Sequence, residues 1–340
     1  MVELLQFSIH GGLSLKTNAG TIIKLSSAYF VVKITGNNFI KTYVKIMYNI
    51  TIISLVFYSL SIIPPVGNYF LNEVAPLFEL PFKNASTFYK VPPNIIVFTF
   101  ERSLFTDFRN SGPFWEPGGF ASYLVIAILL NTIRSNRINQ KINYILVIGV
   151  LTTFSTAGYI ALFILFSGYY LIMNRLSNKI LLFILIFFSI SLYNELSFLK
   201  VKINNNITIA ESSTSSRFGS ALADYNLFIE SPIVGWGRGP NRFGVNNSSY
   251  FSQAEHRNNG VFVLLATYGI IGLSLFYILY FKSYQAICMY YRVNKGFMLI
   301  AILTIFVIGF SQVLFSQLFF FNFLFLFLTY DSKKLQTYKS

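Results

Sequence analysis

Several arginines and one histidine lie in a long polar segment, residues 200–258, of an otherwise apolar chain. The residues there that could do chemistry are Arg217, Arg238, Arg242 and His256. Guanidinium groups form paired hydrogen bonds with phosphate oxygens, and a neutral imidazole can accept a proton from a hydroxyl group. The segment therefore predicts chemistry on an anionic, lipid-borne substrate, in which arginines bind the anion and the histidine activates a nucleophile.

A glycine-rich run lies among these arginines. Residues 235–240 read GWGRGP, so three glycines alternate with other residues. Glycine lets backbone N–H groups approach an oxyanion closely, and the arginine fork matches phosphate oxygens. With Arg217, Arg238 and Arg242 around it, the run predicts a phosphate-binding loop. The alternative is a simple turn with solvated arginines.

His256 lies just before the apolar run 261–281. This position predicts an imidazole at the depth of a lipid headgroup. With an ordinary pKa of about 6.5, it could act there as a general base. A polar helix cap is the alternative interpretation.

A second group of polar residues precedes an earlier apolar run. Arg102 and Arg109 come before residues 112–120, which read GPFWEPGGF. Glu116 followed by Pro117 is typical of a helix start, because proline suits the first turn and an acid there favours the helix dipole. A carboxylate entering a membrane is also costly unless it faces a polar cavity. Glu116 is therefore either a cavity-lining group or a capping residue.

The composition indicates what kind of protein positions these residues. The chain has 54% hydrophobic and 11% charged residues, 38 Phe and a mean hydropathy of +0.58. These values exclude a soluble globular domain of this length. We therefore expect an all-α polytopic membrane protein.

Eight segments approach the roughly 20 apolar residues that a spanning helix needs. They are 46–63, 114–133, 142–154, 157–173, 179–198, 259–281, 296–314 and 316–330. The small and polar residues 152–158 predict a tight turn between the third and fourth segments, and a single tilted helix is the alternative. Residues 217–229 predict a short amphipathic helix in the large loop, with Phe218, Leu222, Tyr225 and Ile229 on one stripe.

The distribution of charge predicts the orientation. If the loops 134–141, 174–179 and 282–295 share a side with both termini, that side holds 16 of the 26 Lys and Arg but only two of the 12 acids. The positive-inside rule assigns this side to the cytoplasm. Segments 64–113 and 199–258 are then extracytoplasmic.

The expected organisation has five parts. They are a cytoplasmic or interfacial segment 1–45, spans within 46–198, the large outer loop 199–258, spans within 259–330 and a cytoplasmic tail 331–340. Residues 20–45 carry four lysines among apolar residues, which predicts an interfacial helix.

Some classes of site are not expected. The pI of about 9.7 does not predict nucleic-acid binding, because the cations lie in short loops next to apolar helices. Cys288 is the single cysteine, and His10 and His256 are the only histidines. We therefore expect no internal disulfide, no transition-metal site and no cofactor.

The ordered combination of several motifs resembles the O-antigen polymerase and O-antigen ligase superfamily. The motifs are 109–124 (RNSGPFWEPGGFASYL), Arg217 with 230–237 (ESPIVGWG), 256–261 (HRNNGV) and 268–273 (YGIIGL). The resemblance covers residues 100–285. Members of the family have ten or more spans, which is more than the eight segments found here. We therefore expect upstream spans to be missing from this chain. Neither Arg102 nor Arg109 fits the arginine-to-glycine spacing of some polymerases.

The resemblance implies a multi-span bundle of the bacterial cytoplasmic membrane with a large extracytoplasmic loop. It implies transfer of glycans from undecaprenyl diphosphate without a metal or nucleotide, with flippase and chain-length regulator proteins as partners. Arg217 and the loop arginines match positions that meet the diphosphate, and His256 matches a histidine that activates the acceptor. We expect a polymerase of O-antigen or capsule repeat units. The alternatives are a ligase onto lipid A core and a non-enzymatic glycolipid flippase or transporter.

Overall fold

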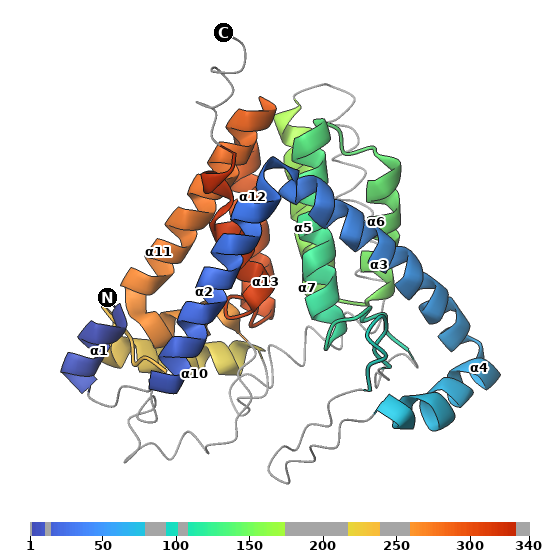
Figure 1. Ribbon diagram of the computed structural model, residues 1–340, viewed down its shortest axis with the longest axis horizontal. Coiled ribbons are helices and arrows are strands. Elements are labelled where there is room, and N and C mark those ends of the chain that lie inside the picture. The colour runs from blue at the N-terminus through green and yellow to red at the C-terminus, as the bar shows by residue number, and fades with distance from the viewer. Residues whose placement is uncertain are drawn as a thin grey trace. The chain divides into compact units, whose positions relative to one another are not determined.

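The computed structural model describes residues 2–10, 15–78, 93–100, 108–173, 217–238 and 259–330, without the side chains of Leu15, Thr17 and Arg217. In these ranges the regular structure is helical (Figure 1), and β pairing is limited to one isolated bridge between Asn94 and Thr99. The chain divides into two compact units. The first contains residues 1–37 and 189–340, and the second contains residues 38–188.

Apolar helices of membrane-spanning length are present in the described residues. Three helical stretches are long and apolar enough to cross a membrane, namely Asn18–Ile62, Pro117–Ser135 and Gly260–Tyr291. Three shorter apolar helices are Lys141–Thr152, Thr156–Ile172 and Gly296–Ser311. The expected span 179–198 lies outside the described residues. The chain is therefore a helical protein suited to a membrane, and the number of eight spans stays a prediction.

In the second unit, helix α5 (Pro117–Ser135) forms the centre. It packs against α3 (Phe39–Ile62), α6 (Lys141–Thr152) and α7 (Thr156–Ile172). Every residue of α5 from Pro117 to Ile133 is buried, which fits a helix that is apolar on all sides. Buried Asn131 donates a 2.8 Å hydrogen bond to Asn143 and so joins α5 to α6.

A tight turn separates α6 from α7. Phe154 has a positive φ of 49°, and the Ser155 hydroxyl accepts a hydrogen bond from the Gly158 N–H as the N-cap of α7. The predicted turn is confirmed, and the alternative of a single tilted helix is wrong.

Residues 20–45 differ from the single interfacial helix expected there. They contain most of α2 (Leu15–Thr35), the 3-10 turn η1 (Gly36–Asn38) and the beginning of α3. Gly36 has a φ of 54°, a left-handed conformation that interrupts the helix. As a result, α3 starts at Phe39, earlier than the expected residue 46.

The described part of the first unit contains two groups of helices. The N-terminal group is α1 (Val2–His10) and α2. The other group is α10 (Arg217–Glu230), α11 (Gly260–Tyr291), α12 (Gly296–Ser311), α13 (Leu318–Phe321) and the 3-10 turns η4 (Asn322–Leu324) and η5 (Leu326–Leu328). Helix α10 confirms the amphipathic helix predicted for residues 217–229.

Helix α11 consists of two legs. Gly269 has non-helical backbone angles, φ 63° and ψ −167°, and interrupts the regular hydrogen bonds. The leg after the break, residues 270–291, is about 33 Å long, which is enough to cross the hydrocarbon core of a membrane. The leg before it, residues 260–268, lies beside α10, where Tyr225 and Phe262 form an edge-to-face pair.

The expected span 316–330 is not a continuous helix. It contains the four residues of α13 followed by η4 and η5. Ser283 of α11 donates a hydrogen bond to the Leu324 carbonyl (2.9 Å) and accepts one from the Phe327 N–H (3.2 Å). A side chain of a neighbouring helix thus replaces part of the segment's own helical hydrogen bonding.

Helix α2 runs beside this segment in the same direction. Near the middle of α2, Lys24 donates to the Ser316 carbonyl at 3.2 Å, and just past its end Asn37 accepts from the Tyr330 hydroxyl at 3.0 Å. The 21 residues of α2 extend about 30 Å along the unit. This length is sufficient for a membrane crossing.

Candidate functional site

Residues 231–237, which follow α10, pack against the break in α11. Four backbone hydrogen bonds join them: Trp236 N–H to the Ala266 carbonyl (2.9 Å), Gly237 N–H to the Thr267 carbonyl (2.8 Å), Ile270 N–H to the Pro232 carbonyl (2.9 Å) and Ile271 N–H to the Ile233 carbonyl (3.3 Å). Backbone groups near the break in α11 are therefore satisfied by the 231–237 segment.

Two glycines make this close approach feasible. Gly235 and Gly237 have φ values of 67° and 73°. A Cβ atom on Gly235 would lie 2.6 Å from the Gly269 nitrogen, closer than real contacts allow. The N–H groups of residues 235–237 all donate to carbonyl groups within the protein. These three N–H groups are therefore engaged within the protein, and the alternative of a turn explains Gly235 and Gly237. Residues 239–240 of the predicted phosphate-binding loop lie outside the described residues, so binding of phosphate by the rest of the run stays a prediction.

We expect Gly235→Ala to destabilise the protein. The left-handed backbone costs a residue with a Cβ about 1–2 kcal/mol, before the overlap with α11 is counted. The thermal unfolding midpoint of the detergent-solubilised protein should fall by about 2–8 °C. Gly20→Ala in α2 is the matched control, because its Cβ would meet nothing within 4 Å. Equal midpoints for the two variants would contradict the tight packing of Gly235.

The N-terminal helix α1 is fixed to the same place by Gln6. The Gln6 side chain is 5% exposed, and its amide nitrogen donates to the carbonyls of Val234 and Thr267, the latter at 2.7 Å. Gln6 therefore bridges the 231–237 segment and the end of the first leg of α11.

His10, at the end of α1, contacts the same segment. Its Nε2 lies 3.0 Å from the Ser231 hydroxyl, and its ring stacks on Trp236 with 4.6 Å between ring centroids. The Trp236 indole in turn donates to the Leu227 carbonyl of α10 at 2.9 Å. These contacts differ from the expected topology, in which residues 1–45 and 199–258 lie on opposite sides, because α1 and the 231–237 segment lie at the same end of this unit.

The two described arginines of this region are placed apart. Arg217 begins α10, whereas Arg238 follows the 231–237 segment at the other end of that helix. The 14 residues of α10 extend about 20 Å. Arg238 is partly buried, and its guanidinium lies 3.5 Å from the Thr21 hydroxyl of α2. The described residues therefore do not bring Arg217 and Arg238 together.

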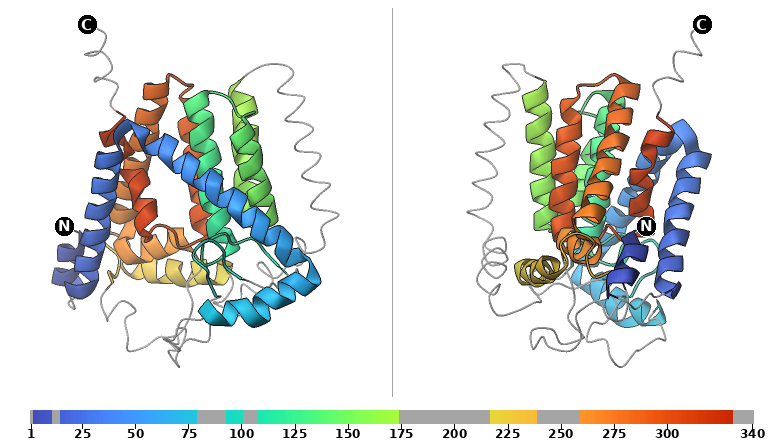
Figure 2. Two further views of the ribbon diagram at one scale, coloured as in Figure 1. Left: turned by 45° about the vertical axis from the view of Figure 1, so that its right-hand side comes forward. Right: turned by 90° about the vertical axis from the view of Figure 1, so that its left-hand side faces the viewer.

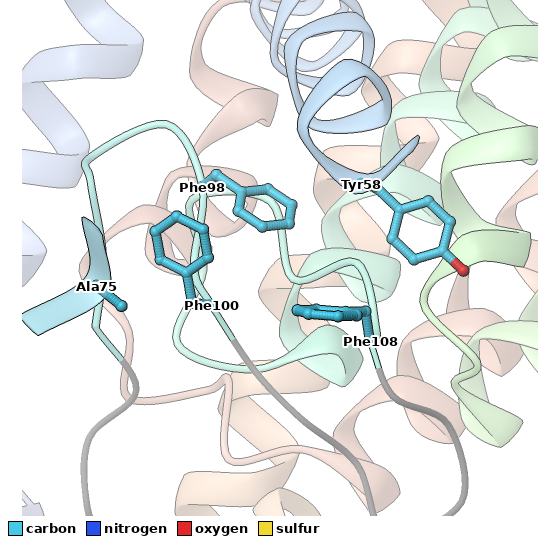
Figure 3. Packing of buried hydrophobic residues seen from close by; sticks show 5 residues of the cluster. All are labelled: Tyr58, Ala75, Phe98, Phe100 and Phe108. Carbon is cyan, nitrogen blue, oxygen red and sulfur yellow. The ribbon is translucent and has the colours of Figure 1, made fainter. Parts of the chain in front are cut away.

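In the second unit, an aromatic cluster supports the segment that carries Arg109. The buried members are Tyr58, Ala75, Phe98, Phe100 and Phe108 (Figure 3). Ala75 belongs to the 3-10 turn η3 (Ala75–Phe78), which is preceded by α4 (Pro64–Tyr69) and the π-helical turn η2 (Phe70–Val74). The cluster thus joins three parts of the expected outer segment 64–113 to the end of α3.

Arg109 itself holds the turn between α6 and α7. Its Nε and Nη2 atoms donate to the carbonyls of Thr153 (3.1 Å) and Phe154 (3.2 Å). Next to it, fully buried Asn110 donates to the hydroxyls of Ser54 and Thr152. Two donors of Arg109 therefore stabilise the fold, and its role in substrate binding stays a prediction.

Glu116 is the N-cap residue of α5, and Pro117 occupies the first turn, as expected for a helix start. Its carboxylate makes no capping hydrogen bond to the helix backbone. It instead accepts a 3.2 Å hydrogen bond from the Trp115 indole. Partly buried Glu116 is thus held at the end of α5 by its neighbour, which leaves both predicted roles open.

The other predicted site residues, Arg102, Arg242 and His256, lie outside the described residues. The nearest described neighbour of His256 is Asn259, which is fully buried. Its side-chain oxygen accepts a 3.1 Å hydrogen bond from the Phe262 N–H and caps α11. The chain therefore leaves this loop directly into the leg of α11 that lies beside α10.

Gln6 and His10 were not among the predicted site residues. A polar residue in a short terminal helix gives no local signal of a contact more than 200 residues away. The glycines at 235, 237 and 269 were the available sign that two backbones approach each other closely.

Neither the comparison with protein-family models nor the comparison with curated protein sequences finds a match to this chain.

Proposed function

We propose that this protein is a membrane glycosyltransferase of the bacterial cytoplasmic membrane. It joins undecaprenyl-diphosphate-linked oligosaccharide repeat units into O-antigen or capsular polysaccharide at the extracytoplasmic face. The observation that supports this most directly is the position of α10 at the end of the apolar helices α11 and α12. Arg217 at its start and Arg238 beyond its end are then close to the membrane boundary, where the diphosphate of a lipid-linked sugar lies.

The proposed reaction is a direct displacement. The bond between the anomeric carbon of the donor and a diphosphate oxygen breaks, and a bond forms to a hydroxyl oxygen of the acceptor sugar. Arginines stabilise the negative charge on the leaving diphosphate. Because α10 separates Arg217 from Arg238, only one of these two can contact a given diphosphate; the other candidates are Arg242 from the large loop and Arg102 and Arg109 from the earlier segment. His256 accepts the hydroxyl proton, with Glu116 as the competing base.

The contacts of α1 with the 231–237 segment lead us to propose a topology that differs from the one expected from the sequence, in which residues 1–45 were cytoplasmic. The end of the first unit opposite α1 carries Lys33, Arg292 and Lys295, which the positive-inside rule places in the cytoplasm. The 231–237 segment and α1 are then both extracytoplasmic, and α2 becomes a crossing of its own. We include α6, α7 and α12 among the crossings despite their shorter length, since bundles can thin the bilayer locally.

Purified protein in vesicles tests the function. Given undecaprenyl-diphosphate-linked repeat units alone, it should produce a ladder of lipid-linked oligomers. Product formed only when lipid A core is added would instead identify a ligase. Movement of the intact donor across the bilayer without new glycosidic bonds would identify a transporter and reject the proposal.

Arg238→Lys should lower polymerisation by about 10- to 100-fold, because lysine keeps the charge but loses the planar fork. Donor titrations in vesicles measure the effect, and membrane insertion should be unchanged. Arg137→Lys, at an exposed residue between α5 and α6, is the control. Wild-type polymer length in the Arg238 variant would remove this residue from the site.

A further inference from the structure

Helix α10 carries an apolar stripe that is about half exposed, although Phe218 and Tyr225 also touch aromatic rings of α12 and α11 at its edge. Phe218, Leu222, Tyr225 and Ile229 form this α10 stripe, and their exposed fractions lie between 43 and 56%. The opposite side of the helix is buried and contains Ser220, Ala223, Asp224 and Leu227. A helix in water would normally show the reverse pattern. The exposed apolar stripe therefore needs an apolar environment outside the described protein.

The stripe is continuous with the exposed face of α12. Leu299, Leu303 and Phe306 are 64, 45 and 46% exposed and follow one side of α12. Phe306 contacts Phe310, and Phe310 packs edge-to-face on Phe218 of α10 with 5.4 Å between ring centroids. One apolar surface thus passes from the short apolar helix α12 onto α10.

The length of α12 indicates why this continuation matters. Its 16 residues extend about 24 Å, less than the roughly 30 Å of a hydrocarbon core. In the right-hand view of Figure 2, α10 is seen nearly along its axis, whereas α12 is seen from the side. Helix α10 therefore lies across the end of α12 and adds a helix diameter of about 10 Å to the apolar surface.

We propose that α10 is an interfacial helix, whose stripe inserts into the acyl-chain boundary of the membrane leaflet at this end of α12. The partner is the lipid itself. The stripe carries no charge, so burial of apolar area rather than attraction to anionic headgroups provides the binding. This inference concerns the placement of α10 in lipid and does not depend on the proposed function.

Nitroxide labels test the placement. The protein with Cys288→Ser and either Leu222→Cys or Tyr225→Cys is labelled and reconstituted into phosphatidylcholine vesicles. Collision rates with oxygen, which concentrates in the acyl chains, and with a water-soluble nickel chelate are then compared. Glu230→Cys is the matched control, because Glu230 is exposed on the same helix but lies off the stripe.

The ratio of oxygen to nickel collisions should be several-fold higher at residues 222 and 225 than at residue 230. Equal and high nickel access at all three positions would show that α10 lies in water and would overturn the proposal. Poor access of both reagents, or spin–spin broadening between labels of two molecules, would also overturn it, because protein would then cover the stripe.

Discussion

Replacing His256 with alanine should slow glycosyl transfer by about 10²- to 10⁴-fold, the usual cost of removing a general base. The variant should accumulate single, unpolymerised repeat units while donor binding persists. The reason is that the arginines that stabilise the leaving diphosphate remain, whereas the acceptor hydroxyl loses its proton acceptor. Single-turnover kinetics with a lipid-linked donor in vesicles would measure the rate, and retention of labelled donor would measure binding.

His10→Ala is the matched control, because His10 is the other histidine of the chain. Its ring contacts Ser231 and stacks on Trp236, so its loss should lower stability and leave the chemical rate of the folded fraction unchanged. Full polymerisation by His256→Ala together with loss of polymer in Glu116→Gln would transfer the role of base to the carboxylate. Wild-type rates in all three variants would reject an acid–base role for these residues.

Single cysteines at residues 8 and 230 should both react from outside in intact cells. Ser8 of α1 and Glu230 of α10 are exposed, and the contacts of Gln6 and His10 place both helices at one end of the first unit. In a Cys288→Ser background, Ser8→Cys and Glu230→Cys should be labelled by a membrane-impermeant maleimide. Lys295→Cys, in the turn between α11 and α12, should be labelled only after permeabilisation. Because the reagent does not cross the membrane, the expected difference is nearly complete.

Two results would contradict this topology. Labelling of residue 8 and residue 230 from opposite sides would disprove the packing of α1 against the 231–237 segment. Labelling of residue 295 in intact cells, with residues 8 and 230 protected, would keep the packing but invert the orientation. The proposed extracytoplasmic reaction would then be rejected.

Local signals in the sequence predicted the elements that they specify directly. The proline at residue 117 marked the start of α5, the small residues 152–158 marked the turn before α7, and the 3.6-residue period marked α10. In each case the information lies within a few residues, because caps, turns and amphipathic periods are local properties of the backbone.

Features that depend on distant residues could not be obtained in this way. The period of α10 predicts a stripe but not whether the stripe faces protein or lipid, and in the structure it is exposed. The break at Gly269 lies within an apolar run that is indistinguishable by composition from a continuous helix. The site was predicted least completely, because α1 packs against the 231–237 segment through Gln6 and His10, more than 200 residues away in the sequence.

That docking also sets an order of events during synthesis. The second unit is one continuous stretch, residues 38–188, and all of its packing partners emerge from the ribosome together. The first unit is split, and 228 residues separate Gln6 from its partner Val234. At ordinary translation rates, α1 waits about 10 to 45 s before that partner exists. The second unit can therefore complete its packing first, and the two parts of the first unit, residues 1–37 and 189–340, pack against each other last.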